Sequence, residues 1–315
     1  MTIGNRAIGA PINIWNDHSD SMSMRDAGWI QLFAETNQEA ADLHIIAFRL
    51  AEELSCPVMV CMDGFILTHA YERVDVATQE LVDQYLPPFD PRQLLDPAAP
   101  MSIGAMVGPE AFTEVRYLAH HKQLRALDRI PVLSDEFEAQ FGRTSGGLIR
   151  SYRTEGADTI VVALGSVNGT IQDVVDEMSE EGAAIGSVSI CSFRPLPLAA
   201  VREALQGAER VVVIEKSLAV GLGGILATDV RMALAGLPVN VYTVIAGLGG
   251  RTVTKASLHK LFRKAEHDTL DSVTFLDLNS GIIQRHFERE SKLRRSGPAA
   301  ENVLCDRGVV AARIG

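Results

Sequence analysis

The sequence is poor in cysteine, with four residues of this type among 315, at positions 56, 61, 191 and 305. They form no CxxC pair and no other spacing typical of clustered metal ligands. This excludes a structural zinc site or an iron–sulfur cluster held by this chain alone. Scattered thiols are typical of proteins from a reducing compartment. We therefore expect reduced cysteines and a cytoplasmic location.

The sequence also lacks a basic excess and a long apolar run. Its 29 lysine and arginine residues are outnumbered by 40 acidic residues, for a formal net charge of −11. Because nucleic-acid binding needs clustered basic side chains, this balance argues against a nucleic-acid partner. No apolar run is long enough for a membrane helix, and residues 1–10 do not resemble a signal peptide. We predict no nucleic-acid partner and no membrane association.

What the chain does contain is enough material for two globular domains, with 47% hydrophobic and 22% charged residues. Apolar residues recur at helical spacing over residues 38–54, which predicts an amphipathic helix. The run PVMVCMDGF (57–65) follows and predicts a buried parallel strand that opens into a loop at its C-terminal end. Residues 3–8 predict a second strand end, so the two loops are expected to lie side by side.

Residues 85–109 contain six prolines and little periodicity. Compact domains rarely hold such long irregular segments without a functional or interface role, so we interpret the segment as a long ordered excursion. Two helices are predicted after it, over 110–127 and 134–141. We place the first domain at 1–142 and a linker at 143–157.

The second domain, residues 158–285, alternates apolar runs with amphipathic segments. The predicted strands cover 159–165, 184–190, 210–215, 239–245 and 273–278, and the predicted helices cover 168–181, 198–205, 221–235 and 254–265. This alternation predicts a parallel sheet covered by helices on both faces. Residues 286–315 are charged and less patterned, and we interpret them as a surface or partner-wrapping tail.

Glycine-rich turns occur at 165–169, 221–224 and 247–250. A dinucleotide fingerprint needs GxGxxG after the first strand and an acidic residue after the second, whereas here the first turn is GxxxG and Glu215 follows the third strand. We interpret the turns as structural turns and helix N-termini, with an anion site as the alternative. A nucleotide-binding protein of the Rossmann type is the weakest functional hypothesis.

The loop after the first predicted strand is crowded with ionisable groups, including Asp17 beside His18. His18, and His69 after the second strand, are either functional or ordinary hydrogen-bonded histidines. Asp17, His18 and Asp20 could coordinate a metal in principle, but adjacent residues rarely reach one ion, so we do not expect a metal site there. Arg6 stands alone among apolar and small residues, as either a surface arginine or a clamp for an anion.

Motifs in both halves of the chain resemble the α subunit of the 2-oxoacid:acceptor oxidoreductases, the pyruvate:ferredoxin oxidoreductase family. In the first half they are NRAIGAPINIWNDHSDSMSMRDAGWIQLFAETNQEA (5–40) and CMDGFILTHAYE (61–72). In the second half they are SYRTEGADTIVVALGSVNGT (151–170), FRPLP (193–197), IEKSLAVGLGG (214–224) and IAGLGGRTVT (245–254). Their joint occurrence in this order is more specific than any single motif.

The resemblance implies an α/β fold, in which a partial pyrimidine-type domain of a thiamine diphosphate enzyme precedes a transketolase C-terminal-like parallel α/β domain. It implies oxidative decarboxylation of a 2-oxoacid, pyruvate by default, to acyl-CoA and CO₂. Thiamine diphosphate and Mg²⁺ would be bound mainly by a β subunit, and iron–sulfur clusters by γ and ferredoxin-like subunits. Coenzyme A would be the co-substrate, and ferredoxin or flavodoxin the acceptor. A non-catalytic assembly subunit is the alternative.

The resemblance also implies roles for individual residues. Arg6 matches an arginine beside the thiazolium face that binds the substrate carboxylate. As hypotheses, Asn13 and Ile14 shape the pocket for the R group of the substrate. The residues expected to hold the loops on the cofactor side, or their contact with a partner chain, are Asp17, His18, Asp63 and His69. We predict no metal ligand in this chain.

The sequence departs from the family at its start. The α subunit of the family carries a preceding segment with a threonine in an ITP-type turn and a glutamate that hydrogen-bonds the aminopyrimidine ring. This sequence begins after both. Because such a carboxylate aids proton transfer by about two to four orders of magnitude, we expect the isolated chain to be inactive. The segment is expected on a separate polypeptide, or the start is misassigned, or the shorter chain is real and does something else.

Overall fold

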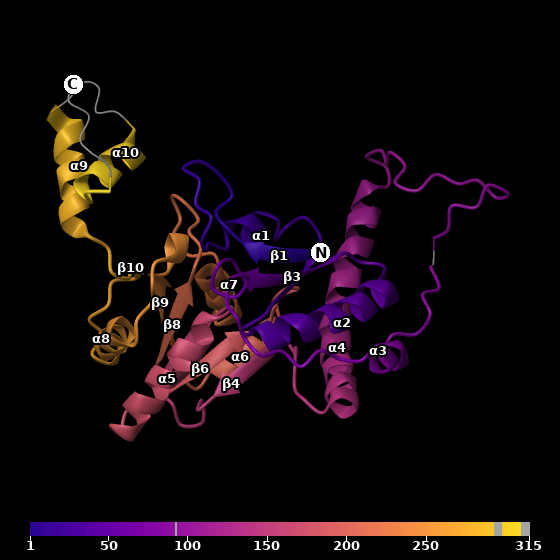
Figure 1. The fold of residues 1–315 in the computed structure, drawn as a ribbon, viewed down its shortest axis with the longest axis horizontal. Coiled ribbons are helices and arrows are strands. Elements are labelled where there is room, and N and C mark those ends of the chain that lie inside the picture. The colour runs from indigo at the N-terminus through magenta and orange to yellow at the C-terminus, as the bar shows by residue number, and fades with distance from the viewer. Residues whose placement is uncertain (92, 293–297, 310–315) are drawn as a thin grey trace.

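The computed structural model describes residues 1–91, 93–292 and 298–309, which form two β-sheets with their helices (Figure 1). The first sheet is built on three parallel strands in the order β1-β3-β2. Their bounds are Thr2–Asn5 for β1, Ile30–Phe33 for β2 and Val58–Asp63 for β3. The two strands predicted around residues 3–8 and 57–65 are therefore confirmed.

Helix α2 (Asn37–Leu54) covers one face of this sheet, as its sequence pattern predicts. It begins at Thr36, whose hydroxyl accepts a hydrogen bond from the backbone N–H of Glu39. Leu43, Ile46 and Leu50 are fully buried. Burial of one apolar stripe thus stabilises both the helix and its position on the sheet.

Helix α4 (Phe112–Phe141) corrects the prediction of two separate helices. Pro131 lies inside it and removes a backbone donor, which by itself weakens a helix. The helix continues because Ala126, Ile130, Leu133 and Phe137 recur on one face and are buried in the same core cluster as α2. Tertiary packing here outweighs the local preference of proline.

The segment between α3 (Gln79–Tyr85) and α4 is the predicted excursion. Its described residues form no helix and no strand. Their one β-type pairing is the isolated bridge between Asp96 and Ala99. In Figure 1 it extends as a magenta loop away from both sheets. Large apolar side chains on it are exposed, namely Phe89, Leu94, Leu95, Met101, Ile103 and Met106.

The second sheet has the strand order β10-β9-β8-β5-β6-β4, and all neighbours except β4 and β6 are parallel. The strands are β4 (Ile149–Tyr152), β5 (Thr159–Ala163), β6 (Ile185–Ile190), β8 (Arg210–Glu215), β9 (Asn240–Ile245) and β10 (Val273–Phe275). The predicted parallel alternation is confirmed. Strand β4 was missed, and it lies within the segment predicted as a linker.

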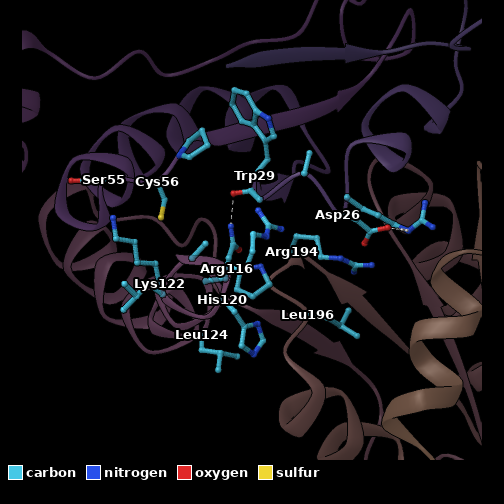
Figure 2. Close-up of a pocket in the computed structure, with 18 of the residues that line it drawn as sticks. Asp26, Trp29, Ser55, Cys56, Arg116, His120, Lys122, Leu124, Arg194 and Leu196 are labelled. Atoms are coloured by element: carbon cyan, nitrogen blue, oxygen red, sulfur yellow. Dashed lines mark hydrogen bonds and ion pairs between the residues drawn. The ribbon is translucent and has the colours of Figure 1, made fainter. Parts of the chain in front are cut away.

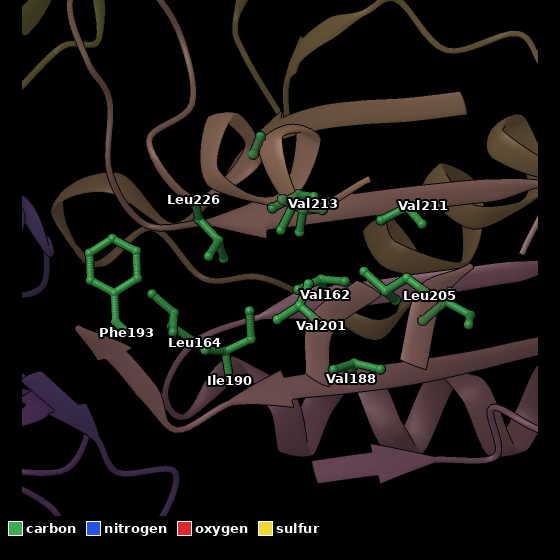
Figure 3. Close-up of a cluster of buried hydrophobic side chains, with 14 of the residues drawn as sticks. Val162, Leu164, Val188, Ile190, Phe193, Val201, Leu205, Val211, Val213 and Leu226 are labelled. Atoms are coloured by element: carbon green, nitrogen blue, oxygen red, sulfur yellow. The ribbon is translucent and has the colours of Figure 1, made fainter. Parts of the chain in front are cut away.

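Helices cover both faces of the second sheet, as predicted. They are α5 (Val167–Glu180) and α8 (Lys255–Glu266) on one face, and α6 (Leu198–Leu205) and α7 (Leu226–Ala233) on the other. Figure 3 shows the cluster on the second face, where Val201, Leu205 and Leu226 meet strand residues such as Val162 and Val213. Each face is therefore a separate apolar core.

The two sheets are joined by a strand that the sequence did not predict. Strand β7 (Ser192–Arg194) follows β6 directly and pairs antiparallel with β2 of the first sheet. Phe33 and Cys61 from the first sheet belong to the same buried cluster as Phe193. Because backbone pairing and a shared core connect the sheets, the strand-end loops of both are held in fixed relation.

The C-terminal part, predicted as a surface tail, contains helices in its described residues. Helix α9 (Ser280–Lys292) and helix α10 (Ala299–Asp306) are linked by an ion pair of 3.0 Å between Arg289 and Asp306. They lie apart from the two sheets in Figure 1. Residues 293–297 and 310–315 lie outside the described residues. No helix in the described part of the chain combines the length and apolarity needed to span a bilayer.

Candidate functional site

The candidate site lies where β1 and β3 end. Asn5 and Asp63, the last residues of these strands, are direct partners in the parallel ladder. The loops that follow therefore start side by side, as the sequence predicted. Gly64 has no room for a side chain, because an added Cβ would lie 2.3 Å from the carbonyl oxygen of Asn5. This glycine allows the two strand ends to approach so closely.

Arg6 is exposed directly after β1, and its backbone is held by a neighbouring carboxylate. Its N–H donates to Asp20 Oδ2 at 2.9 Å. Asn5 Nδ2 in turn donates to Asp20 Oδ1 and to Ser21 Oγ, both at 2.8 Å. Among the described residues, no carboxylate forms an ion pair with the Arg6 guanidinium. The backbone is thus fixed while the side chain stays available for an anion.

Two of the predicted residues, His18 and Asp63, meet in a buried group that we call the Asp63 cluster: His18, Asp63, Ser166 and Lys216. His18 Nε2 lies 2.5 Å from Asp63 Oδ1, and Lys216 Nζ lies 2.7 Å from Asp63 Oδ2. The Ser166 backbone N–H donates to Asp63 Oδ2 at 2.9 Å, and its hydroxyl donates to the same oxygen. His18, Asp63 and Lys216 are at most 3% exposed. The cluster therefore joins both sheets through one carboxylate.

The electrostatics of the Asp63 cluster favour the carboxylate form. Burial opposes ionisation, but the charge of Lys216 and the contact with His18 outweigh it, so the pKa of Asp63 is held far below its usual range. Ser166 stands at the N-terminus of α5, where unpaired backbone N–H groups also attract an anion. An ionised Asp63 thus has partners on every side.

The same cluster explains the glycine-rich turn at 165–169. Gly165 has a positive φ of 72°, and an added Cβ would lie 3.2 Å from both Asp63 carboxylate oxygens. The anion that this helix N-terminus binds is therefore a side chain of the protein itself. Glu215 does the same at α7, where it accepts hydrogen bonds from the backbone N–H groups of 225, 226 and 227. These turns hold internal carboxylates, which disfavours the nucleotide-binding hypothesis.

The loop from Arg6 to Asp17 crosses onto the second sheet. Asn13 Nδ2 donates to the Gly249 carbonyl oxygen at 3.2 Å, and the Gly250 N–H donates to Asn16 O at 3.1 Å. At Gly249 an added Cβ would lie 2.6 Å from Asn13 Nδ2. The turn at 247–250 therefore packs closely against the loop. Ile14, in the same loop, is 49% exposed.

Asp17 and His69 do not join the Asp63 cluster. Asp17 Oδ1 accepts a hydrogen bond of 2.7 Å from the Ser19 N–H, so it shapes the start of α1 (Ser19–Ser23). His69 is exposed and stacks on Phe65, with ring centroids 5.0 Å apart. The structure therefore brings together two of the four residues predicted on the cofactor side.

Lys216 and Ser166 are site residues that the sequence reasoning missed, and Asp20 was considered only as a metal ligand and not as the partner of Asn5 and Arg6. Lys216 and Ser166 stand just after β8 and β5, at the C-terminal edge of the second sheet. Their positions are a sequence signal, because parallel α/β sheets place functional polar groups at that edge. The signal could not assign these residues to the site, because nothing in the sequence indicates that this edge faces Asp63.

Comparisons with known proteins agree with the motifs. A family model described as "Pyruvate flavodoxin/ferredoxin oxidoreductase, thiamine diP-bdg" matches residues 1–134, and "Pyruvate:ferredoxin oxidoreductase core domain II" matches residues 157–258. The pyruvate synthase subunit PorA of Methanosarcina barkeri is 40% identical over 294 residues, which are 90% of this chain and 73% of that protein. The chain belongs to the pyruvate:ferredoxin oxidoreductase α-subunit family. The predicted family and fold class are confirmed.

Other members of the family act on different 2-oxoacids by name. PorA of Pyrococcus furiosus is 42% identical over 271 residues, covering 84% of this chain and 68% of that protein. The ketoisovalerate oxidoreductase subunit VorA of Pyrococcus horikoshii is 35% identical over 274 residues, covering 85% and 70%. As a family member, the chain is an α-type subunit of a pyruvate or 2-oxoacid:ferredoxin oxidoreductase.

One solved structure supports the fold. It is the 2-oxoglutarate:ferredoxin oxidoreductase from Magnetococcus marinus, with 2-oxoglutarate, coenzyme A and succinyl-CoA bound. The similarity covers 83% of this chain and 47% of that one, with a TM-score of 0.56 and 15% identity. At this identity the comparison shows the fold alone.

Proposed function

We propose that this chain forms the substrate-binding wall of a thiamine diphosphate-dependent enzyme that converts a 2-oxoacid, pyruvate by default, to acyl-CoA and CO₂. The observation that carries the proposal is Arg6, an exposed arginine whose backbone is fixed by Asp20 and whose guanidinium has no carboxylate partner among the described residues. It stands at a strand end within the region that matches the thiamine diphosphate-binding family model.

The residues at this edge fit the substrate side of such a cofactor. Arg6 offers a planar guanidinium that binds a carboxylate through two parallel hydrogen bonds. Ile14 and Trp15, later in the same loop, present exposed apolar surface. Asp63, in contrast, is fully engaged by His18, Ser166 and Lys216, so its carboxylate holds the two sheets together rather than a ligand.

The described residues contain no group of three His, Cys, Asp or Glu side chains that could hold a metal ion. We derive no metal-binding role for this chain. On the family resemblance, we propose that a β subunit holds the diphosphate and Mg²⁺, and that γ and ferredoxin-like subunits carry iron–sulfur clusters. Ferredoxin or flavodoxin is proposed as the acceptor, and coenzyme A as the co-substrate.

We propose that this chain contributes by binding and orienting the 2-oxoacid substrate. When bound, thiamine diphosphate supplies the carbanion chemistry that a 2-oxoacid needs to lose CO₂. Arg6 holds the substrate carboxylate until CO₂ leaves. Asn13 and Ile14 border the R group, and His18 and Asp63 hold the loop on the second sheet.

The test is to isolate the protein from its native extract without oxygen and to identify every co-purifying chain by mass spectrometry. Viologen reduction is then assayed with a panel of 2-oxoacids plus coenzyme A. We expect reduction that depends on thiamine diphosphate and on one preferred 2-oxoacid. A preparation without thiamine diphosphate, cluster subunits and activity would overturn the proposal in favour of a non-catalytic assembly subunit.

We expect Ile14 to influence which size of 2-oxoacid the enzyme prefers. We expect Ile14→Ala to raise kcat/KM for a branched 2-oxoacid relative to pyruvate by about tenfold, because room for extra methylene groups in a substrate pocket is worth a factor of this order. The control is Leu278→Ala, since Leu278 is 50% exposed and Ile14 is 49% exposed. An equal ratio in both variants and the unaltered enzyme would contradict the assignment. The same assay applies to Asn13→Ala.

A further inference from the structure

A groove of about 880 Å³ lies away from the proposed active site. It runs between the N-terminal half of α4, the turn before β3 and the corner between β7 and α6 (Figure 2). Trp29 and Pro57, which precede β2 and β3, line it. The groove therefore sits at the N-terminal edge of the first sheet, opposite the edge that carries Arg6.

The α4 side of the groove is apolar and unusually exposed. Helices of globular proteins normally bury an apolar stripe. Residues 112–125 of α4 instead expose large side chains, with Tyr117 at 66% and Leu118 at 60%. The others are Phe112, Val115 and Leu124. The excursion that leads into α4 carries further exposed apolar side chains, and its residue Gln93 lines the groove. Exposed apolar side chains gathered along one helix mark an interaction site.

The same surface is basic on a chain that is acidic as a whole. Arg116, Lys122 and Arg125 lie on this half of α4, against one acidic residue, Glu114, while the net charge of the chain is −11. Within the described residues, none of these cations forms an ion pair. Arg194 in the opposite wall is already engaged, because it pairs with Asp229 at 2.8 Å and lies over the Phe193 ring.

A hydrogen bond fixes one wall of the groove to the first sheet. Gln123 Nε2 donates to the Gly28 carbonyl oxygen at 2.7 Å, which ties α4 to the loop before β2. Figure 2 shows Arg116, His120 and Lys122 from α4 on one side and Arg194 and Leu196 on the other. Helix α4 thus places Arg116 and Lys122 beside apolar lining residues such as Trp29 and Pro57.

We propose that this groove and the N-terminal half of α4 dock an acidic segment with large apolar anchors that belongs to a different subunit of the complex. Charge complementarity supports this occupant over a second copy of this chain, because the cations of α4 need acidic partners beside an apolar contact. The inference does not rest on the role of Arg6.

The experiment uses the assembled native complex. We expect Arg116→Glu/Lys122→Glu to weaken retention of one partner subunit by more than about tenfold, because charge reversal places like charges across the interface. The matched control is Lys260→Glu/Lys264→Glu on α8, which reverses two exposed lysines outside the groove. Partner retention is measured by titration at low and high salt, and unfolding of each variant chain is followed in parallel.

A photo-reactive amino acid at Tyr117 identifies the occupant. A cross-link to an acidic segment of another subunit, together with weaker retention in the α4 variant alone, supports the proposal. A cross-link to a second copy, no intermolecular cross-link, or equal losses in both charge variants would overturn it. Arg6→Ala separates this result from the proposed function, because it should lower kcat/KM for the 2-oxoacid and leave the subunit composition unchanged.

Discussion

Arg6→Ala in the assembled enzyme is expected to lower kcat/KM for the 2-oxoacid by about 100-fold or more. A guanidinium that binds a carboxylate through two charge-assisted hydrogen bonds contributes roughly 1.5–3 kcal/mol per bond to the binding free energy of the substrate. Binding of thiamine diphosphate should not change, because the proposal places Arg6 on the substrate and not on the cofactor. Steady-state kinetics and cofactor titration measure the two effects separately.

Two further variants sharpen this test. Arg6→Lys keeps the charge and loses the planar fork, so we expect activity between that of Arg6→Ala and the unaltered enzyme. Arg307→Ala removes an exposed arginine at the end of α10 and serves as the matched control. Unchanged kinetics in Arg6→Ala would discard the carboxylate role. A parallel loss of cofactor binding would show that Arg6 supports the site as a whole.

The sequence predicted the elements whose signals are local. The amphipathic pattern of 38–54 and the buried run of 57–65 each match an observed element closely, and β8 and α6 coincide with their predictions. Strong periodicity and burial on both faces make such segments recognisable without knowledge of their neighbours. Arg6 was chosen as a candidate for a related local reason, since it stands alone among small and apolar residues, and its role stays a prediction.

The features that were missed depend on distant residues. Strand β7 has three residues and follows β6 closely, and only its pairing with Gln31 and Leu32 in the other sheet reveals that it changes sheets. Helix α4 continues past Pro131 because α2 packs against it. Lys216 and Asp63 are 153 positions apart. The division into domains at 1–142 and 158–285 stays a prediction, as do the substrate and cofactor roles of the predicted residues.

Lys216→Met is expected to have the largest effect on stability, a loss of about 3–5 kcal/mol in the free energy of unfolding near pH 7. The reason is that it leaves the Asp63 carboxylate buried without its cation. In the double variant Asp63→Asn/Lys216→Met, neither charge remains, so much of this loss should be recovered. Lys255→Met is the control, because Lys255 pairs with Asp173 and Glu177 on the surface and should change stability little. Denaturant unfolding of the four proteins measures these differences.

The pH dependence separates charge from packing. Since the pKa of Asp63 is lowered in the folded protein, the stability it contributes is present above its unfolded pKa of about 3.9 and is lost as pH falls further. Without Lys216, burial raises that pKa, so the variant is penalised near neutral pH and relieved on acidification. The difference between the two proteins should therefore shrink toward pH 4. A difference that stays constant with pH would assign the loss to the aliphatic stem of Lys216, and the two sheets would then be joined mainly through β7 and the core around Phe193.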